Sequence, residues 1–225
     1  MRVDLVVFDM AGTTVYDGDA VNICLRAALD GAGFGVTRDA VNEVMGLPKP
    51  EAIRLLMERR DPSAATPARV DQIHSDFVRR MIEYYRSDPA VRESDGATQT
   101  FQALRARGVK LAVDTGFSRP ITDVILARLT WMRDGLLDAS VTSDEVARGR
   151  PHPDMLQRAM QLTGVADVNR VAKVGDTPSD LYEGQNAGCG FVIGVTSGSH
   201  TRAELEPHPH THLIEHLAEL PALLR

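Results

Sequence analysis

Short apolar runs alternate along the chain with longer amphipathic stretches. The apolar runs predict strands at residues 3–8, 110–114, 139–142, 171–174 and 191–195. The amphipathic stretches between them predict helices at residues 94–107, 120–128, 153–162 and 179–187. Such alternation is typical of a parallel sheet that is covered by helices on both faces. The pattern therefore predicts an α/β fold with a doubly wound parallel sheet.

One segment departs from this alternation. Residues 17–86 show only helical periodicity, which does not fit a simple crossover between two strands. We interpret this segment as an α-helical cap domain that is inserted after the first strand and closes over the crevice of the core. The core domain then comprises residues 1–16 and 87–225. Within the cap, residues 58–66 are polar and predict a loop between two helices.

The composition narrows the classes of protein that fit. Hydrophobic residues make up 43% and charged residues 25% of the chain, which is the profile of a soluble globular protein. A net charge of −6 gives no support for binding to nucleic acid or to an anionic membrane. The chain has no apolar run long enough for a membrane-spanning helix and no signal-peptide pattern, so we expect a cytoplasmic protein. Cys24 and Cys189 lack the spacing of metal ligands and are interpreted as reduced, buried residues.

Polar residues follow three of the predicted strands, at or just past their carboxyl ends. These residues are Asp9, Thr115 and Asp176. The ligand crevice of a parallel α/β sheet lies at this edge, so we expect the three side chains to converge. Asp9 and Asp176 supply two carboxylates for Mg²⁺, which usually binds one or two of them together with phosphate and water oxygens. Asp180 either binds the metal directly or orients one of its ligands.

The same crevice holds groups that suit a phosphoryl group. Thr115 offers a hydroxyl, and Gly116 offers free backbone N–H groups, for phosphate oxygens. The guanidinium of Arg150 can neutralise the charge that develops on a transferring phosphoryl group. With Asp9 as the nucleophile, these are the parts that transfer through an aspartyl-phosphate needs. Further candidates for binding the substrate or its phosphate are Thr13, Gly46 and Arg119, the last of which is equally compatible with a surface position.

The order of these residues resembles a known family. Asp9, Thr115, Arg150 and the pair Asp176 and Asp180 follow the four motifs of the haloacid dehalogenase superfamily. The resemblance covers essentially the whole chain, including a helical cap between the first and second motifs. It implies a Rossmann-like core with a small cap and a Mg²⁺-dependent hydrolase activity.

Ala11 points to one branch of that superfamily. Ordinary phosphatases of the superfamily have Asp two positions after the nucleophile, where it protonates the leaving oxygen, whereas this chain has Ala11. The string Asp9-Met10-Ala11-Gly12-Thr13-Thr14 and the presence of Arg150 resemble the phosphonatases, which are phosphonoacetaldehyde hydrolases. This resemblance implies that the backbone carbonyl of Ala11 helps to hold the magnesium. It also implies cleavage of a carbon–phosphorus bond after a cap lysine has formed a Schiff base with the substrate aldehyde.

The lysine that matches this pattern is Lys49. Because Pro50 suits the first turn of a helix, Lys49 is expected at a helix N-terminus. The helix dipole opposes a cation there and lowers the pKa of the amine, which a Schiff-base lysine needs in order to be nucleophilic. A solvated lysine and a cap cation that binds phosphate are the two alternatives for this residue.

Three positions differ from the phosphonatase pattern. Ala52 stands where the branch has His, Asp19 where it has a cysteine, and Phe117 where it has Tyr. The missing His and Tyr would handle protons around the Schiff base. These differences leave open whether the substrate is phosphonoacetaldehyde or a related small phosphonate.

The sequence thus favours a hydrolase that cleaves a small phosphonate through an aspartyl-phosphate. One alternative is a phosphomonoester phosphatase of the phosphoglycolate type, in which Lys49 binds the phosphate or carboxylate of the substrate. Another is a non-catalytic binding protein on the same scaffold. The expected partner is a small phosphonate or phosphate ester, and the amphipathic cap helices are compatible with a homodimer.

Overall fold

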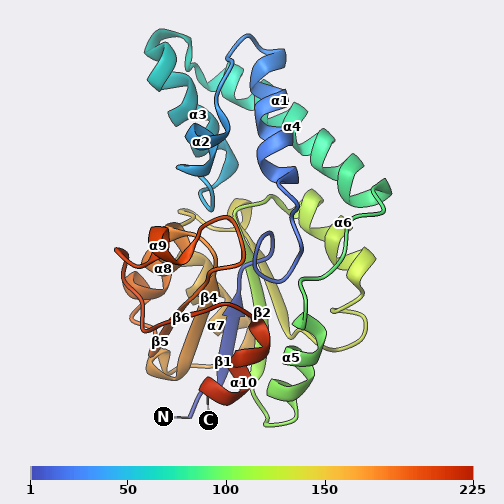
Figure 1. The fold of residues 1–225 in the computed structure, drawn as a ribbon, viewed down its shortest axis with the longest axis vertical. Helices are drawn as coiled ribbons and strands as arrows, with labels where there is room; N and C mark the ends of the chain where they lie inside the picture. The colour runs from blue at the N-terminus through green and yellow to red at the C-terminus, as the bar shows by residue number, and fades with distance from the viewer. Residues whose placement is uncertain (1, 225) are drawn as a thin grey trace.

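The computed structural model describes residues 2–224, in which a six-stranded sheet lies beneath a group of helices (Figure 1). Neighbouring strands are all parallel, in the order β3-β2-β1-β4-β5-β6. The strands are β1 (Leu5–Phe8), β2 (Lys110–Thr115), β3 (Ala139–Thr142), β4 (Val171–Gly175), β5 (Phe191–Val195) and β6 (His212–Ile214). The five predicted strands are all present, and β6 adds a short sixth strand at one edge.

Each face of the sheet buries its own set of side chains. On β1, Val6 and Phe8 join one apolar cluster, whereas Leu5 and Val7 join another. All four are fully buried, as expected for a parallel strand that is covered on both faces. The first cluster includes side chains of α5 and α6, and the second includes side chains of α7. The predicted doubly wound parallel sheet is therefore confirmed.

The predicted helices of the core recur with only small changes at their ends. The helices around the sheet are α5 (Ala97–Arg105), α6 (Arg119–Leu129), α7 (Asp154–Thr163), α8 (Pro178–Ala187), α9 (Arg202–Leu205) and α10 (Leu220–Leu223). The largest difference is at α5, which begins at Ala97 rather than at residue 94. It begins later because the Ala97 N–H donates to the Ser94 carbonyl in a turn, at 3.0 Å. Short 3-10 turns lie at Pro62–Ala64, Ser143–Glu145, Val168–Arg170 and Leu217–Glu219.

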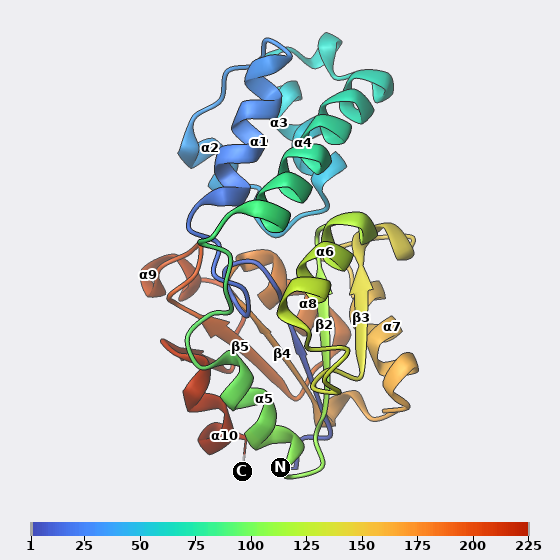
Figure 2. The same cartoon turned by 90° about the vertical axis from the view of Figure 1, so that its right-hand side faces the viewer.

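The segment predicted as a cap forms four helices beyond the carboxyl ends of the strands (Figures 1 and 2). These are α1 (Ala20–Gly31), α2 (Arg38–Asn42), α3 (Lys49–Arg60) and α4 (Pro67–Ser87). The predicted loop over residues 58–66 was wrong at its start, because α3 continues to Arg60 and α4 begins at Pro67. The boundaries of the two domains stay predictions. Within residues 2–224, no helix is both long and apolar enough to cross a membrane.

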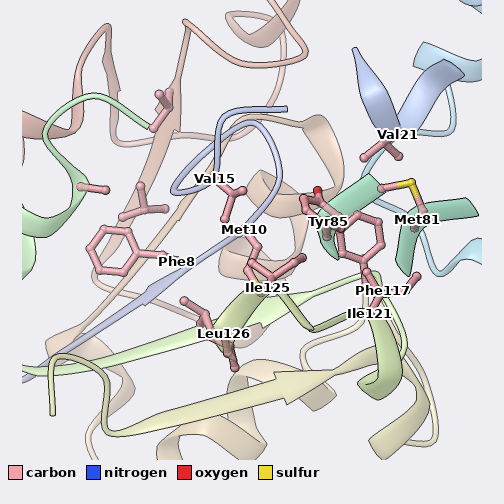
Figure 3. Packing of buried hydrophobic residues seen from close by; sticks show 14 of the residues in the cluster. Phe8, Met10, Val15, Val21, Met81, Tyr85, Phe117, Ile121, Ile125 and Leu126 are labelled. Atoms are coloured by element: carbon pink, nitrogen blue, oxygen red, sulfur yellow. The ribbon is translucent and has the colours of Figure 1, made fainter. Parts of the chain in front are cut away.

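The cap and the core meet where α4 packs on α6. Figure 3 shows Tyr85 of α4 beside Phe117, which precedes α6, with 6.0 Å between the ring centroids. Tyr85 is fully buried, and within residues 2–224 its hydroxyl has no hydrogen-bond partner. A buried hydroxyl without a partner loses its hydration and gains nothing in return.

Tyr85→Phe is therefore expected to keep or raise the stability of the protein, by up to about 1–3 kcal/mol in the free energy of unfolding. Urea unfolding of both proteins measures the difference. Thr122→Val is the matched control, because the buried Thr122 hydroxyl donates to the Ser118 carbonyl at 3.2 Å. This control variant should lose stability. A clear loss of stability in Tyr85→Phe would show that its hydroxyl has a partner.

Candidate active site

The topology of the sheet brings Asp9 and Asp176 together. Asp9 follows β1 and Asp176 follows β4, and these strands are neighbours in which Phe8 pairs with Val174. The Asp9 N–H donates to the Val174 carbonyl at 2.8 Å, so the two carboxylates leave the sheet side by side. Thr115 ends β2 on the other side of β1. The structure therefore places all three at the carboxyl edge of the sheet.

Asp176 and Asp180 are held in place by hydrogen bonds from Thr13, Ser199 and Thr177. Asp176 accepts hydrogen bonds from the Thr13 hydroxyl at 2.9 Å and from the Ser199 N–H at 2.6 Å. Asp180 lies in the first turn of α8, where its Oδ2 accepts from the Thr177 hydroxyl at 2.6 Å as part of a capping box. Thr13, predicted to bind phosphate, is thus placed beside the carboxylates and orients one of them.

Asp9, Asp176 and Asp180 form a buried group whose carboxylate oxygens lie within 4.8 Å of one another. Burial, together with the nearby carboxylate of Asp180, raises the pKa of Asp9 to about 7 and that of Asp176 to about 6. A cation between these carboxylates would remove that repulsion, and their all-oxygen donor set suits a hard divalent ion such as Mg²⁺. The residues therefore fit a divalent metal, and Ala11 lines a cavity together with Asp9.

Arg150 is almost completely buried and points at the predicted nucleophile. Its Nη1 lies 2.6 Å from Oδ1 of Asp9 and 3.0 Å from Oδ1 of Asp180. Its Nε donates to Glu183 at 2.9 Å, and its Nη2 contacts Asp114. A guanidinium fixed in this way presents a permanent positive charge beside Asp9.

Three buried charged residues in this region were missed by the sequence reasoning: Asp114, Lys173 and Glu183. Asp114 and Lys173 were counted only as members of strands, and Glu183 only as part of a helix. The available signal was a charged residue within a run of apolar residues, as Lys173 is within Val171–Gly175. A charged residue in a central strand must have buried partners, but the sequence of the strand does not show which residues these are.

The cap reaches the core site through the segment that precedes α3. A Cβ on Gly116 would lie 2.8 Å from the Leu47 carbonyl oxygen, so only glycine allows the cap backbone to come this close. Gly46 of the same segment lines one small cavity with Asp9, Thr115 and Arg150. The predicted phosphate-binding residues Gly46, Gly116 and Thr115 therefore lie together.

Lys49 lines this cavity from the cap side. It is the first residue of α3, as predicted, and only 4% of it is exposed. Its Nζ lies 5.6 Å from the centroid of the Phe117 ring and 3.4 Å from the Leu47 carbonyl. The pKa of Lys49 is lowered to about 8, as the sequence argument expects, but burial is the largest cause.

The cavity between cap and core is small. Its volume is about 20 Å³, which is room for roughly one water molecule. This volume is too small for a substrate, so we expect the cap to move away from the core before a substrate enters. A larger cavity of about 360 Å³ is lined by Gly12 and Thr13 together with Asp17 and Arg38.

Arg119 is placed away from this group. Its Nε donates to Glu145 at 3.2 Å. Its Nη2 also contacts Glu145 and donates to the Ser140 carbonyl at 3.1 Å. These contacts hold it at the start of α6, outside the cavity between cap and core. Arg119 was predicted as a candidate for binding the substrate, but within residues 2–224 it is not among the residues that line this cavity. Cys24 and Cys189 are free, as predicted, but both are half-buried, whereas the sequence predicted buried residues.

Lys49→Met is expected to stabilise the protein at pH 7 by about 3 kcal/mol. The pKa of Lys49 falls from 10.5 when unfolded to about 8 when folded, so folding below pH 8 carries the full cost of burying its charge. That cost disappears as the pH rises from 8 to 10.5, and the stabilities of the two proteins should converge. Urea unfolding at pH 7 and pH 10 tests this. The half-exposed Lys110 gives the control variant Lys110→Met, which should show no such stabilisation.

A profile of haloacid dehalogenase-like hydrolases matches residues 6–194. The chain belongs to this family of hydrolases. The hydrolase is 31% identical over 209 residues to the phosphonoacetaldehyde hydrolase of Bacillus cereus strain B4264, with 88% of this chain and 78% of that protein covered. The expected resemblance to that branch is confirmed.

Solved structures show the same fold as this hydrolase. A phosphonoacetaldehyde hydrolase-like protein from Oleispira antarctica aligns with a TM-score of 0.83 at 21% identity, covering 100% of this chain and 92% of that one. A proposed phosphoglycolate phosphatase from Lactobacillus delbrueckii aligns with a TM-score of 0.82 at 20% identity, covering 100% and 99%. At these identities the comparison establishes the shared architecture alone.

Proposed function

We propose that this hydrolase is Mg²⁺-dependent and cleaves the carbon–phosphorus bond of a small phosphonate, such as phosphonoacetaldehyde or a relative. The observation that carries the proposal is the cavity that Lys49 shares with Asp9, while the alanine at position 11 supplies no proton donor. An amine with a lowered pKa therefore stands opposite the predicted nucleophile. An ester phosphatase needs an acid at the leaving oxygen, whereas an imine needs a neutral amine.

The first step is formation of the imine on the cap. The neutral Nζ of Lys49 attacks the aldehyde carbon to give a carbinolamine, which takes up one proton from solvent and loses water to give a protonated imine. The lowered pKa of Lys49 supports this step, because the amine must lose its proton before it can attack. In the small cavity little water remains to hydrolyse the imine.

The second step is phosphoryl transfer to Asp9. Oδ of Asp9 bonds to phosphorus as the carbon–phosphorus bond breaks, and the bonding electron pair passes to the iminium to form an enamine. Arg150 and the Thr115 hydroxyl stabilise the phosphoryl oxygens, together with the backbone N–H groups around Gly116. Protonation and hydrolysis release the aldehyde and free Lys49. Water then attacks the aspartyl-phosphate and releases inorganic phosphate.

The metal fits the carboxylates of Asp9, Asp176 and Asp180 together with the Ala11 carbonyl oxygen. When bound, Mg²⁺ would neutralise negative charge on the phosphonate and on the nucleophile. Asp176 and Asp180 are kept in place by Thr13, Ser199 and Thr177, independently of substrate. A cytoplasmic location and a homodimer stay predictions of the sequence, as does the absence of nucleic-acid and membrane partners.

The test is borohydride trapping in the presence of phosphonoacetaldehyde. The chain has only three lysines, Lys49, Lys110 and Lys173, so peptide mass spectrometry locates an adduct without ambiguity. We expect a stable secondary amine on Lys49. Lys173 is an internal control, because its carboxylate partners raise its pKa and keep it charged.

Two other outcomes decide between the alternatives. Absence of an adduct, together with Mg²⁺-dependent turnover of phosphate esters such as phosphoglycolate, would favour the phosphatase. Absence of turnover across phosphonates and phosphate esters would favour a binding protein on this scaffold.

A further inference from the structure

Every nitrogen of the Arg150 guanidinium has a partner. Nη1 faces Asp9 and Asp180, Nε donates to Glu183 at 2.9 Å, and Nη2 donates to the Asp114 carbonyl at 2.9 Å and contacts its carboxylate. A planar fork that is held at all three nitrogens has one orientation. The carboxylates of Asp114 and Glu183 thus decide where the charge of Arg150 lies relative to Asp9.

Lys173 ties these carboxylates to one another. Its Nζ lies 2.8 Å from Oε2 of Glu183 and 3.3 Å from Oδ1 of Asp180, and it contacts Asp114. Lys173 is fully buried, and the structure gives it no contact with Asp9. The amine therefore lies one layer behind the reacting atoms.

The fold brings α8 unusually close to β4 at this point. A Cβ on Gly184 would lie 2.9 Å from the Cβ of Lys173 and 3.0 Å from Cγ2 of Val192. The absence of a side chain at Gly184 lets the helix approach, and the preceding Glu183 then reaches both Lys173 and Arg150. Glycine is unfavourable in the interior of a helix, yet Gly184 stands there at the position where this contact is made.

We propose that Lys173, Asp114 and Glu183 are positioning residues, which hold the Arg150 guanidinium against Asp9 for phosphoryl transfer. They touch neither the cavity nor Asp9, and they act through Arg150. The kinetic part of this proposal rests on the proposed function, whereas its structural part does not.

Three variants distinguish a role in positioning Arg150 from a role in stability alone: Lys173→Met, Glu183→Gln and their combination. Lys173→Met leaves four buried carboxylates facing Arg150 alone and should lower the melting temperature strongly, whereas Glu183→Gln removes one of the excess negative charges and should lower it less. The double variant removes one cation and one anion, so the net charge of the cluster is that of the original protein and most of the melting temperature lost in Lys173→Met should return. If Lys173, Asp114 and Glu183 position Arg150, the crystal structure of the double variant should still show a guanidinium displaced from Asp9. Its kcat with phosphonoacetaldehyde should be about 100-fold lower, with KM little changed.

Gly184→Ala provides a second test that keeps every charge. The added methyl pushes Glu183 away from Lys173, so kcat should fall while KM stays near its original value. Arg105→Met is the control, because Arg105 pairs with Asp138 at 2.8 Å and lies far from the site, at the other end of β2. It should lower the melting temperature and leave kcat within about twofold.

The proposal is overturned if the double variant recovers its melting temperature and its guanidinium stays beside Asp9. It is equally overturned if Gly184→Ala separates Glu183 from Lys173 without moving Arg150. Failure of the original protein to cleave phosphonoacetaldehyde would contradict the proposed function alone, since the position of the guanidinium is read without turnover.

Discussion

Asp9→Asn is expected to lower turnover by a factor on the order of 10⁴ or more and to leave the fold intact. The amide has no anionic oxygen to bond to phosphorus, so no aspartyl-phosphate forms. The fold should persist because burial already disfavours the charged form of Asp9, raising its pKa to about 7. Without metal at pH 8, the variant should melt at the same temperature as the original protein or higher. Steady-state assays with Mg²⁺ and calorimetry measure the two effects.

Asp17→Asn is the matched control for this prediction. Asp17 is a half-buried acid whose pKa is raised to about 6, chiefly by loss of solvent, but it lines the larger cavity and not the one beside Lys49. Its variant should keep activity within about tenfold. If Asp9→Asn keeps activity, or if Asp17→Asn loses as much, another residue is the nucleophile.

The position of Asp9 was predictable because two independent patterns agree on it. Apolar runs place the strands, and parallel strands bring their carboxyl ends to one edge. Asp9, Thr115 and Asp176 follow from these rules, and the structure places them there. Asp180 follows as well, since its spacing from Asp176 puts it in the first turn of α8.

The partners of the two predicted arginines were not predictable from sequence. Arg119 and Arg150 each stand beside a proline near a helix, and both suit a phosphate. In the structure Glu145 holds Arg119 outside the cavity, whereas Glu183 and Asp114 hold Arg150 inside it. Which carboxylate binds a guanidinium depends on residues far away in the chain, and local patterns carry no information on this.

For Lys49, the direction of the pKa shift was predicted correctly, but its main cause was not. The sequence argument lowers its pKa through the dipole of the helix that begins there, and the structure places it at that helix start. The structure adds burial as the largest cause, because the cap segment closes on the core. Lys173 is equally buried, yet its pKa is raised, since three carboxylates surround it. Burial alone therefore does not lower the pKa of a lysine; burial without an ion-pair partner does.

Lys49→Arg is expected to lower the rate of carbon–phosphorus cleavage by a factor on the order of 10⁴ and to leave the binding of inorganic phosphate unchanged. Arginine keeps a positive charge at the same place, so any electrostatic contribution of Lys49 survives. It cannot form an imine with an aldehyde, and its guanidinium stays protonated. Single-turnover assays with phosphonoacetaldehyde measure the loss, and calorimetric titration measures phosphate binding.

The same variant separates the two enzyme functions. Under imine chemistry, Lys49→Arg loses phosphonate cleavage and shows no adduct after borohydride treatment. Under ester hydrolysis, a cap cation only binds substrate, so Lys49→Arg should keep kcat for phosphoglycolate within about tenfold and mainly change KM. Retained cleavage of phosphonoacetaldehyde by Lys49→Arg would rule out the Schiff base. In that case the electron pair of the breaking bond would need another acceptor, and neither Ala11 nor Phe117 can provide one.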